Sequence, residues 1–210
     1  MLCNLTVEAG AKAGIVEPDD KVVEYVTAHG RKAEHLYQSD PDAQFAAVYE
    51  YDLSKIEPVV VRPDFVDNFA TLSEVKEEKI AIDQAFLGSC NNGRLCDLRA
   101  AADVVRGKKV ADTVRFLVAP ASQQVYIDAM NEGIISTLME AGAMIMNPNC
   151  SVCWGSCQGV IGENEVLIST GTRNFKGRCG SPSSKVYMAS AATVAASAVA
   201  GYITGAQDVK

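Results

Sequence analysis

Residues 80–119 read IAIDQAFLGSCNNGRLCDLRAAADVVRGKKVADTVRFLVA, and this stretch decides the fold class. Apolar residues dominate Ile80–Leu87 and Val114–Ala119, at a length typical of buried strands. Between them, Arg94–Arg106 has the composition of a helix and stops at Gly107, a common residue at helix ends. A strand, a helix and a second strand in this order indicate a βαβ unit with parallel strands.

The same alternation continues toward the C-terminus, where helical segments and short apolar strands follow one another. The sequence therefore predicts an α/β fold with three layers, α/β/α, in which helices cover both faces of a mostly parallel sheet. The further predicted elements are helices within Ser122–Ala141, strands at Ala143–Met146, Val166–Thr170 and Val186–Met188, and a helix at Ala191–Ile203.

The pattern is weaker in the first part of the chain. Helices are predicted at Leu5–Gly14, Asp19–His29 and Pro41–Tyr49, followed by an extended piece at Pro58–Arg62. Proline, asparagine and charged residues make Pro63–Glu78 a predicted linker.

Two domains are therefore expected. Residues 1–75 are expected to be part of a preceding α/β domain with its linker. Residues 76–210 hold the regular alternation of strands and helices, and they are expected to form the three-layer domain.

Composition limits the class of protein. The 210 residues carry a formal net charge of -7 and no cluster of Lys and Arg, which argues against nucleic acid as a partner. The most apolar stretch, Ala189–Thr204, is shorter than the ~20 apolar residues that span a bilayer, so no membrane partner is expected. Leu2–Gly14 lacks the features of a signal peptide, and the expected location is the cytoplasm.

The seven cysteines are an odd number, and cytoplasmic proteins keep few disulfides. Ligation of a metal or a cluster is therefore the better use for some of them. They are Cys3, Cys90, Cys96, Cys150, Cys153, Cys157 and Cys179.

Polar motifs follow three of the predicted strands. Gly88–Gly93 holds the first cysteine of the domain, Pro148–Cys153 holds a C-x-x-C pair, and Thr172–Phe175 holds an arginine. Because parallel strands end at the same edge of a sheet, we expect these loops to form one ligand crevice.

Thiolates are soft ligands that suit zinc, copper(I) or an iron–sulfur cluster. Spacing alone does not choose among them, since Cys150, Cys153 and Cys157 also form a local C-x2-C-x3-C run. A C-x-x-C pair is equally compatible with a redox dithiol, and free cysteines are common in protein cores. From the residues alone, a cluster, a zinc site, a dithiol and plain buried cysteines all remain open.

Longer strings resemble one family. GSCNNGRLCDLRAAADVVRGKKVAD (88–112), NPNCSVCWG (147–155) and TRNFKGR (172–178) are similar, in order and spacing, to the aconitase and isopropylmalate dehydratase superfamily. LCNLTVEAGAKAGI (2–15) and VDNFATLSEV (66–75) match as well, so the resemblance covers essentially the whole chain. The likeness is greatest to the large subunits of 3-isopropylmalate dehydratase and homoaconitase.

The resemblance implies a [4Fe-4S] cluster as cofactor, with Cys90, Cys150 and Cys153 as its ligands. It leaves Cys3, Cys96, Cys157 and Cys179 as non-ligands.

The resemblance also assigns roles to polar side chains. Arg173 and Arg178 of the R-N-F-x-G-R segment are expected to bind substrate carboxylates, because a guanidinium binds a carboxylate through two hydrogen bonds. The resemblance also implies a catalytic role for Arg173. Glu8 is expected to be catalytic and Asn4 to bind substrate, both near the cluster on one helix face. Asn92 and Asn174 are expected to support the ligands. Where the family has an asparagine before the arginine motif, this chain has Thr172.

The implied function is that of a hydro-lyase acting on a small hydroxy-di- or tricarboxylate such as 3-isopropylmalate or homocitrate. The family's histidine- and aspartate-bearing N-terminal segment and its small, swivelling subunit have no match here. Both are expected partners, and the chain alone is expected to be inactive. The alternative, from another class, is a stand-alone zinc- or cluster-binding module for interaction or redox sensing.

Overall fold

The computed structural model describes residues 1–209, which form two compact units. The first unit covers Met1–Ile56, and the second begins at Glu57. No side chain in the first unit is fully buried, whereas the second unit contains the hydrophobic core.

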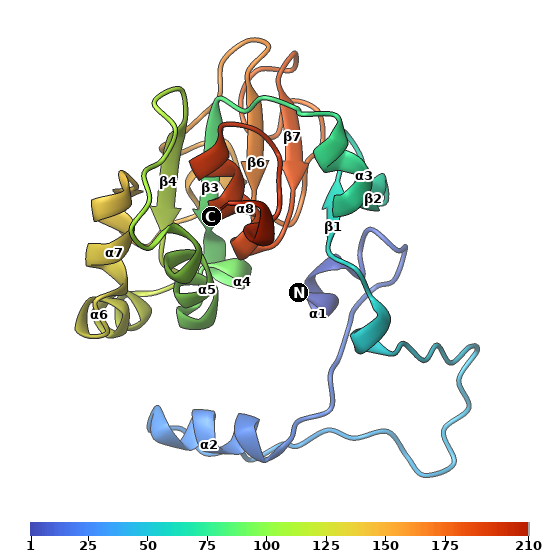
Figure 1. Ribbon diagram of the computed structural model, residues 1–210. Coiled ribbons are helices and arrows are strands. Elements are labelled where there is room, and N and C mark those ends of the chain that lie inside the picture. Colours follow the sequence, from blue (N-terminus) through green and yellow to red (C-terminus); the bar gives the residue numbers. More distant parts are fainter. Residues whose placement is uncertain (210) are drawn as a thin grey trace. The chain divides into compact units, whose positions relative to one another are not determined.

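The second unit is built on a seven-stranded sheet with the strand order β2-β1-β7-β6-β3-β4-β5 (Figure 1). The five strands from β7 to β5 are parallel, while β1 and β2 extend the sheet with antiparallel pairing. The predicted α/β class with a mostly parallel sheet is therefore confirmed. The strands are β1 Val59–Val61, β2 Phe69–Thr71, β3 Gln84–Gly88, β4 Arg115–Ala119, β5 Met144–Ile145, β6 Val166–Ser169 and β7 Lys185–Met188.

The helices of the described chain vary from one short turn to three turns (Figure 1). They are α1 Leu2–Leu5, α2 Asp20–Ala28, α3 Leu72–Glu77, α4 Ser89–Asn92, α5 Leu95–Val105, α6 Gln123–Asn131, α7 Ile134–Ala141 and α8 Ala191–Ala200, with 3₁₀ turns η1 Leu53–Lys55, η2 Ser151–Cys153 and η3 Ala206–Asp208.

Side chains alternate between the two faces of the sheet, as the pleat of a strand requires. On β3, Ala85 and Leu87 join the larger core, which α5, α7 and α8 cover. Phe86, between them, belongs to a smaller core on the other face. That second face is covered by the loops around Val152 and Ile161 and by η2, rather than by long helices.

Most predicted elements of the sheet are present with ends moved by a few residues. Predictions for the first 78 residues did less well. Pro63–Glu78 is not a linker, because it contains β2 and α3; α3 starts with a capping box in which Thr71 and Glu74 bond to each other's backbone N–H. Leu72 and Val75 of α3 are buried in the core.

Two predicted helices are wrong. Pro41–Tyr49 is irregular, and Leu5–Gly14 is replaced by the short α1 and a series of turns. Isolated short helices are marginal without a packed apolar face, and the first unit offers none. The predicted Asp19–His29 helix is present as α2, capped by the Asp19 side chain, which accepts from Val22 N at 3.0 Å.

The sequence pattern predicted a domain boundary at residues 75–76, whereas the compact units divide after Ile56. The reason is that β1, β2 and α3 pack with the sheet. That the first unit belongs to a further α/β domain stays a prediction. Within residues 1–209, no helix has the length and apolar character needed to cross a bilayer.

The core beneath α5 gives a direct test of this packing. Leu98 is 0% exposed, so Leu98→Ala should lower the free energy of unfolding by about 2–5 kcal/mol through lost burial and a residual cavity. Urea denaturation followed by circular dichroism measures this change. Met139→Ala is the matched control, because Met139 is 59% exposed and its truncation should cost less than about 0.5 kcal/mol. Equal effects of the two substitutions would contradict the described core.

Candidate functional site

Parallel pairing brings the ends of β3, β5 and β6 to one edge of the sheet (Figure 1). The loops that leave this edge carry the residues singled out in the sequence. Cys90 follows β3, Cys150 and Cys153 follow β5, and Arg173 follows β6. The C-terminal edge of the sheet is therefore the candidate site within the second unit.

A tight turn presents Cys90. Ser89 is 2% exposed and has a φ of 79°, a left-handed value that costs energy for a residue with a side chain. Gly88 and Gly93 flank the turn, and a Cβ on either would lie 2.6 Å from the carbonyl oxygen of Ala119. The turn is thus pressed against the end of β4 while the Cys90 side chain is exposed.

Thr170 ties this turn to the neighbouring strand. Its Oγ1 accepts from Gly88 N at 2.9 Å and donates to Gly88 O at 3.1 Å. Asn92 Nδ2 donates to Thr170 O, so both ends of the cysteine turn are bonded to one residue. Thr170 is 1% exposed, and buried hydrogen bonds of this kind are expensive to lose.

The other two thiols are those of Cys153, the last residue of η2, and of Cys150, the residue before η2. Cys153 N donates to Cys150 O at 3.0 Å, which closes a tight turn between the two cysteines. Val152 between them is fully buried, and Ser151 Oγ donates to Gln158 O at 2.9 Å. Cys150 is exposed and Cys153 is half-buried.

Arg178 joins the arginine segment to the C-x-x-C loop, since its Nε donates to Cys153 O at 2.9 Å. The two loops pack closely, because a Cβ on Gly155 would lie 2.1 Å from Arg178 O. Arg173 Nη1 donates to Thr172 Oγ1 at 3.3 Å. The arginine and cysteine loops therefore form one bonded assembly.

Asn174 is fully buried, and its Nδ2 donates to Arg62 O at 2.6 Å, which ties the arginine segment to the end of β1. Its Oδ1 is buried without a hydrogen-bond partner within the described residues. Asn4 lies in α1, which ends at Leu5, and Glu8 lies in the turn that follows. The two residues therefore do not share a helix face, as they were expected to. The roles assigned to these three residues stay predictions.

The donor chemistry at this edge fits an iron–sulfur group. A Cβ on Gly171 would lie 3.8 Å from Cys153 Sγ, so the missing side chain keeps room beside that thiol. Among the described residues, no group of three or more His, Cys, Asp or Glu side chains is arranged to hold a single metal ion.

The other cysteines differ in their surroundings. Cys179 is 2% exposed, and burial, followed by the neighbouring Cys153, raises the pKa of its thiol to about 12. Cys179 therefore stays a protonated core thiol at neutral pH. Cys96 and Cys157 are exposed, like Cys150, so exposure alone does not separate Cys157 from the predicted ligands.

Sequence patterns did not single out Thr170 or Ser89. A signal for Thr170 was available, because Thr170 and Gly171 directly follow the buried strand β6 at the edge where ligand crevices form. The partner of the Thr170 hydroxyl is 82 residues away in the chain, so its role needed the structure.

Thr170→Val should destabilise the chain, because it leaves the N–H and C=O of Gly88 without their hydroxyl partner. Each unpaired buried group should lower the free energy of unfolding by about 1–3 kcal/mol. Urea denaturation measures this change. Thr170→Ser keeps the hydroxyl and should recover most of the loss. Equal stability of the Val and Ser variants would show that the hydroxyl does not hold the turn.

Alkylation of the native chain by iodoacetamide at pH 8 should spare the buried Cys179 and modify exposed cysteines such as Cys90, Cys150 and Cys157. With a pKa of about 12, only about one Cys179 in ten thousand is a thiolate at that pH. Peptide mass spectrometry measures the labelling, and denatured protein provides the control for full reactivity. Rapid native labelling of Cys179 would contradict its described burial.

Residues 1–201 match the model of the aconitase family, described as aconitate hydratase. The chain is 50% identical over 204 residues to the probable 3-isopropylmalate dehydratase large subunit of Methanothermobacter thermautotrophicus, covering 97% of this chain and 48% of the relative. It is 49% identical over 209 residues to the homoaconitase large subunit of Thermus thermophilus, covering 100% of this chain and 48% of the relative. The chain thus spans about half the length of the curated relatives that it matches.

Proposed function

The chain belongs to the aconitase family, and from this premise we propose that it is the part of a hydro-lyase that binds a [4Fe-4S] cluster through Cys90, Cys150 and Cys153. The observation that carries the proposal is the assembly of bonded loops at one sheet edge. Thr170 holds the turn of Cys90, and Arg178 binds the carbonyl of Cys153. Two of the three thiols are exposed and the third is half-buried, so all are open to a ligand.

A [4Fe-4S] cluster that is bound entirely by protein takes four cysteine ligands. With only three thiolates, one iron would have no ligand from the protein. A cluster bound in this way would supply a Lewis acid for the hydroxyl and carboxylate oxygens of a substrate. The role of the chain is then to hold the three thiols in place and to orient the substrate.

The arginines provide that orientation. Arg178 Nε donates to the carbonyl oxygen of Cys153, and the two Nη groups of the same planar guanidinium are proposed to donate to a substrate carboxylate. Arg173, which donates from Nη1 to Thr172, is proposed to bind a second carboxylate. Asn92 is proposed to support the thiolate of Cys90, because its bond to Thr170 O fixes the same turn.

The proposed substrate is a small hydroxy-di- or tricarboxylate, in keeping with the relatives named as 3-isopropylmalate dehydratase and homoaconitase. From the resemblance alone, Glu8 is proposed as a catalytic group and Asn4 as a substrate contact. Because the relatives are about twice as long and are named as large subunits, the proposed partners are the remaining large-subunit segment and a small subunit. The chain alone is proposed to be inactive.

Anaerobic reconstitution with iron and sulfide tests the ligand set. The chain should take up about four irons, and Cys90→Ser, Cys150→Ser and Cys153→Ser should each lose most of them. Cys96→Ser and Cys157→Ser are matched controls, because these exposed cysteines lie outside the proposed set. Trp154 gives a second readout, since the only tryptophan is next to Cys153 and its fluorescence should fall when the cluster forms.

Two results would contradict the proposal. Full iron uptake by Cys90→Ser would reject the ligand set. Tightly bound zinc that is lost on Cys157→Ser, with no uptake of iron by the parent chain, would favour the alternative of a stand-alone zinc-binding module.

A further inference from the structure

The two arginines of the segment after β6 are attached to different parts of the fold. Arg178 Nε donates to Cys153 O, and the next residue, Cys179, accepts from Ile161 N at 3.0 Å. The bond from Arg173 Nη1 to its neighbour Thr172 stays within the segment. The end of the segment that carries Arg173 is connected to the sheet by the residue after it, Asn174.

Asn174 bonds to two strands at once. Its Nδ2 donates to Arg62 O at 2.6 Å, at the end of β1, and to Val186 O of β7 at 3.4 Å. β1 and β7 pair at Val61 and Met188, so both acceptors lie beside the point where that pairing ends. The Asn174 side chain is 0% exposed, so water does not compete for these bonds.

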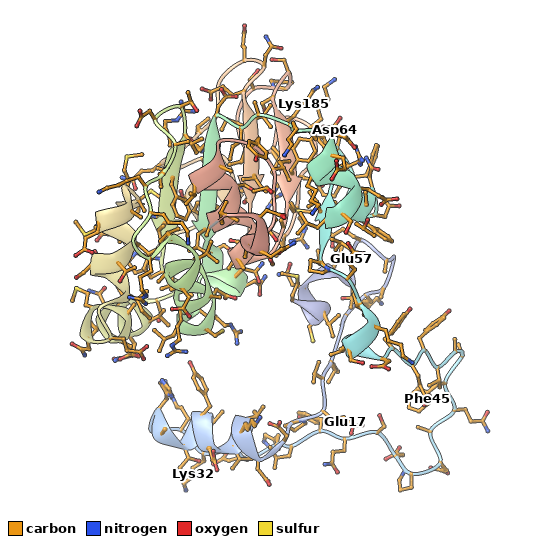
Figure 2. All side chains as sticks on the ribbon, viewed as in Figure 1. Glu17, Lys32, Phe45, Glu57, Asp64 and Lys185 are labelled. Atoms are coloured by element: carbon orange, nitrogen blue, oxygen red, sulfur yellow. The ribbon has the colours of Figure 1, made fainter. Side chains whose placement is uncertain are left out.

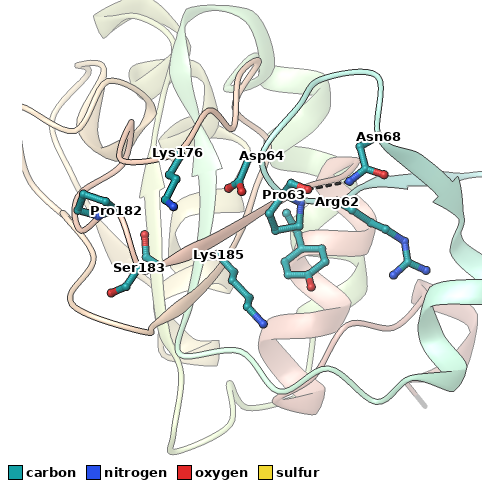
Figure 3. Close-up of a pocket in the computed structure, with 10 residues that line it drawn as sticks. Arg62, Pro63, Asp64, Asn68, Lys176, Pro182, Ser183 and Lys185 are labelled. Carbon is teal, nitrogen blue, oxygen red and sulfur yellow. Dashed lines mark hydrogen bonds between the residues drawn. The ribbon is translucent and has the colours of Figure 1, made fainter.

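The acceptor on the β1 side belongs to an ordered turn. Arg62 N donates to Asn68 O at 2.6 Å, and the Arg62 guanidinium forms a double ion pair with Glu78. Asn68 Nδ2 donates to Pro63 O at 2.7 Å (Figure 3). The carbonyl that accepts from Asn174 is therefore held in place from both sides of the turn.

The arginine segment and the turn after β1 also line one open hollow. Arg62 and Lys176 are on its walls, together with Asp64 and Lys185 (Figure 3). Figure 2 shows Asp64 near Lys185, the first residue of β7. The segment thus runs beside both the turn after β1 and the start of β7, which agrees with the two bonds of Asn174.

The second polar atom of this side chain indicates what the asparagine contributes. Asn174 Oδ1 is buried and accepts no hydrogen bond from the described residues. A buried acceptor without a partner costs free energy, and a leucine of similar size would avoid that cost. The contribution of the asparagine is thus the pair of bonds that Nδ2 donates.

We propose that Asn174 is a positioning residue, which sets where the guanidinium of Arg173 meets a carboxylate of the substrate. The role rests on the proposed function, in which Arg173 binds a carboxylate. Because the two residues are neighbours, fixing Asn174 restricts the backbone of Arg173 before a substrate arrives. Arg178 is attached separately through Cys153 O, so loss of the Asn174 bonds displaces one arginine and not the other.

NMR relaxation of the full chain tests the attachment without a substrate. Asn174→Leu removes the donor and keeps a side chain of similar size. Asn68→Leu is the matched control, because it removes an amide-to-carbonyl bond outside the arginine segment. The ¹H–¹⁵N heteronuclear NOE should fall at residues 172–175 in the first variant and stay unchanged at residues 179–180. The control should change neither range.

The chain reconstituted with its cluster tests the positioning. Binding of 3-isopropylmalate is followed by the EPR spectrum of the cluster after reduction with dithionite. Asn174→Leu should take up as much iron as the parent chain, whereas its half-saturating ligand concentration should rise about tenfold. The same substitution should cost less than about twofold in an Arg173→Gln chain, which has already lost the guanidinium, and still about tenfold in an Arg178→Gln chain.

The outcomes separate the two proposals. A parent chain that takes up no iron, or that does not respond to 3-isopropylmalate, rejects the proposed function, and the relaxation measurement still decides whether Asn174 holds the segment. Unchanged NOE values, equal loosening at both ranges, or a full tenfold effect in the Arg173→Gln chain overturns the role of Asn174. If Asn174→Leu does not fold, Asn174→Ser replaces it, because a hydroxyl has one donor where the amide has two.

Discussion

The parallel pairing of β3 with β4 and β6 is the constraint on which the rest of the structure depends. Because Leu87 lies beside Val118 and Phe86 beside Ser169, the chain leaves three neighbouring strands at one edge. Loops of unrelated sequence are thereby brought together, and hydrogen bonds between them complete the arrangement. Thr170, bonded to both backbone groups of Gly88, is the contact that fixes the two central loops.

The two faces of the sheet serve different purposes. The face under α5 and α8 is a conventional hydrophobic core in which small residues such as Ala101 and Ala195 let the helices approach closely. The other face is covered by the cysteine and arginine loops, which pack on Phe86 and Leu167. Burial on that face thus supports the same loops that carry the candidate site, so stability and function share one set of contacts.

Local patterns were sufficient for much of this fold. The strand and helix patterns of residues 80–119 predicted β3, α5 and β4, because each buries a continuous apolar surface. They predicted β1 as the extended piece Pro58–Arg62 but missed β2, which pairs with β1. The pairing of β1 with Met188 of β7, far along the chain, also needed the structure. Local patterns also failed where a helix pattern had no core to pack on, as at Pro41–Tyr49. At the site, motif cysteines were visible in the sequence, whereas the partners of Thr170 and Arg178 depended on loop packing.

The central claim is that thiols from two separate loops hold one cluster and leave one iron without a protein ligand. A Mössbauer spectrum of the chain reconstituted with ⁵⁷Fe measures this directly. The account predicts two kinds of iron site in a ratio of about 3:1, with the minor site changed by added hydroxycarboxylate. Four equivalent irons, or only mononuclear iron, would contradict it.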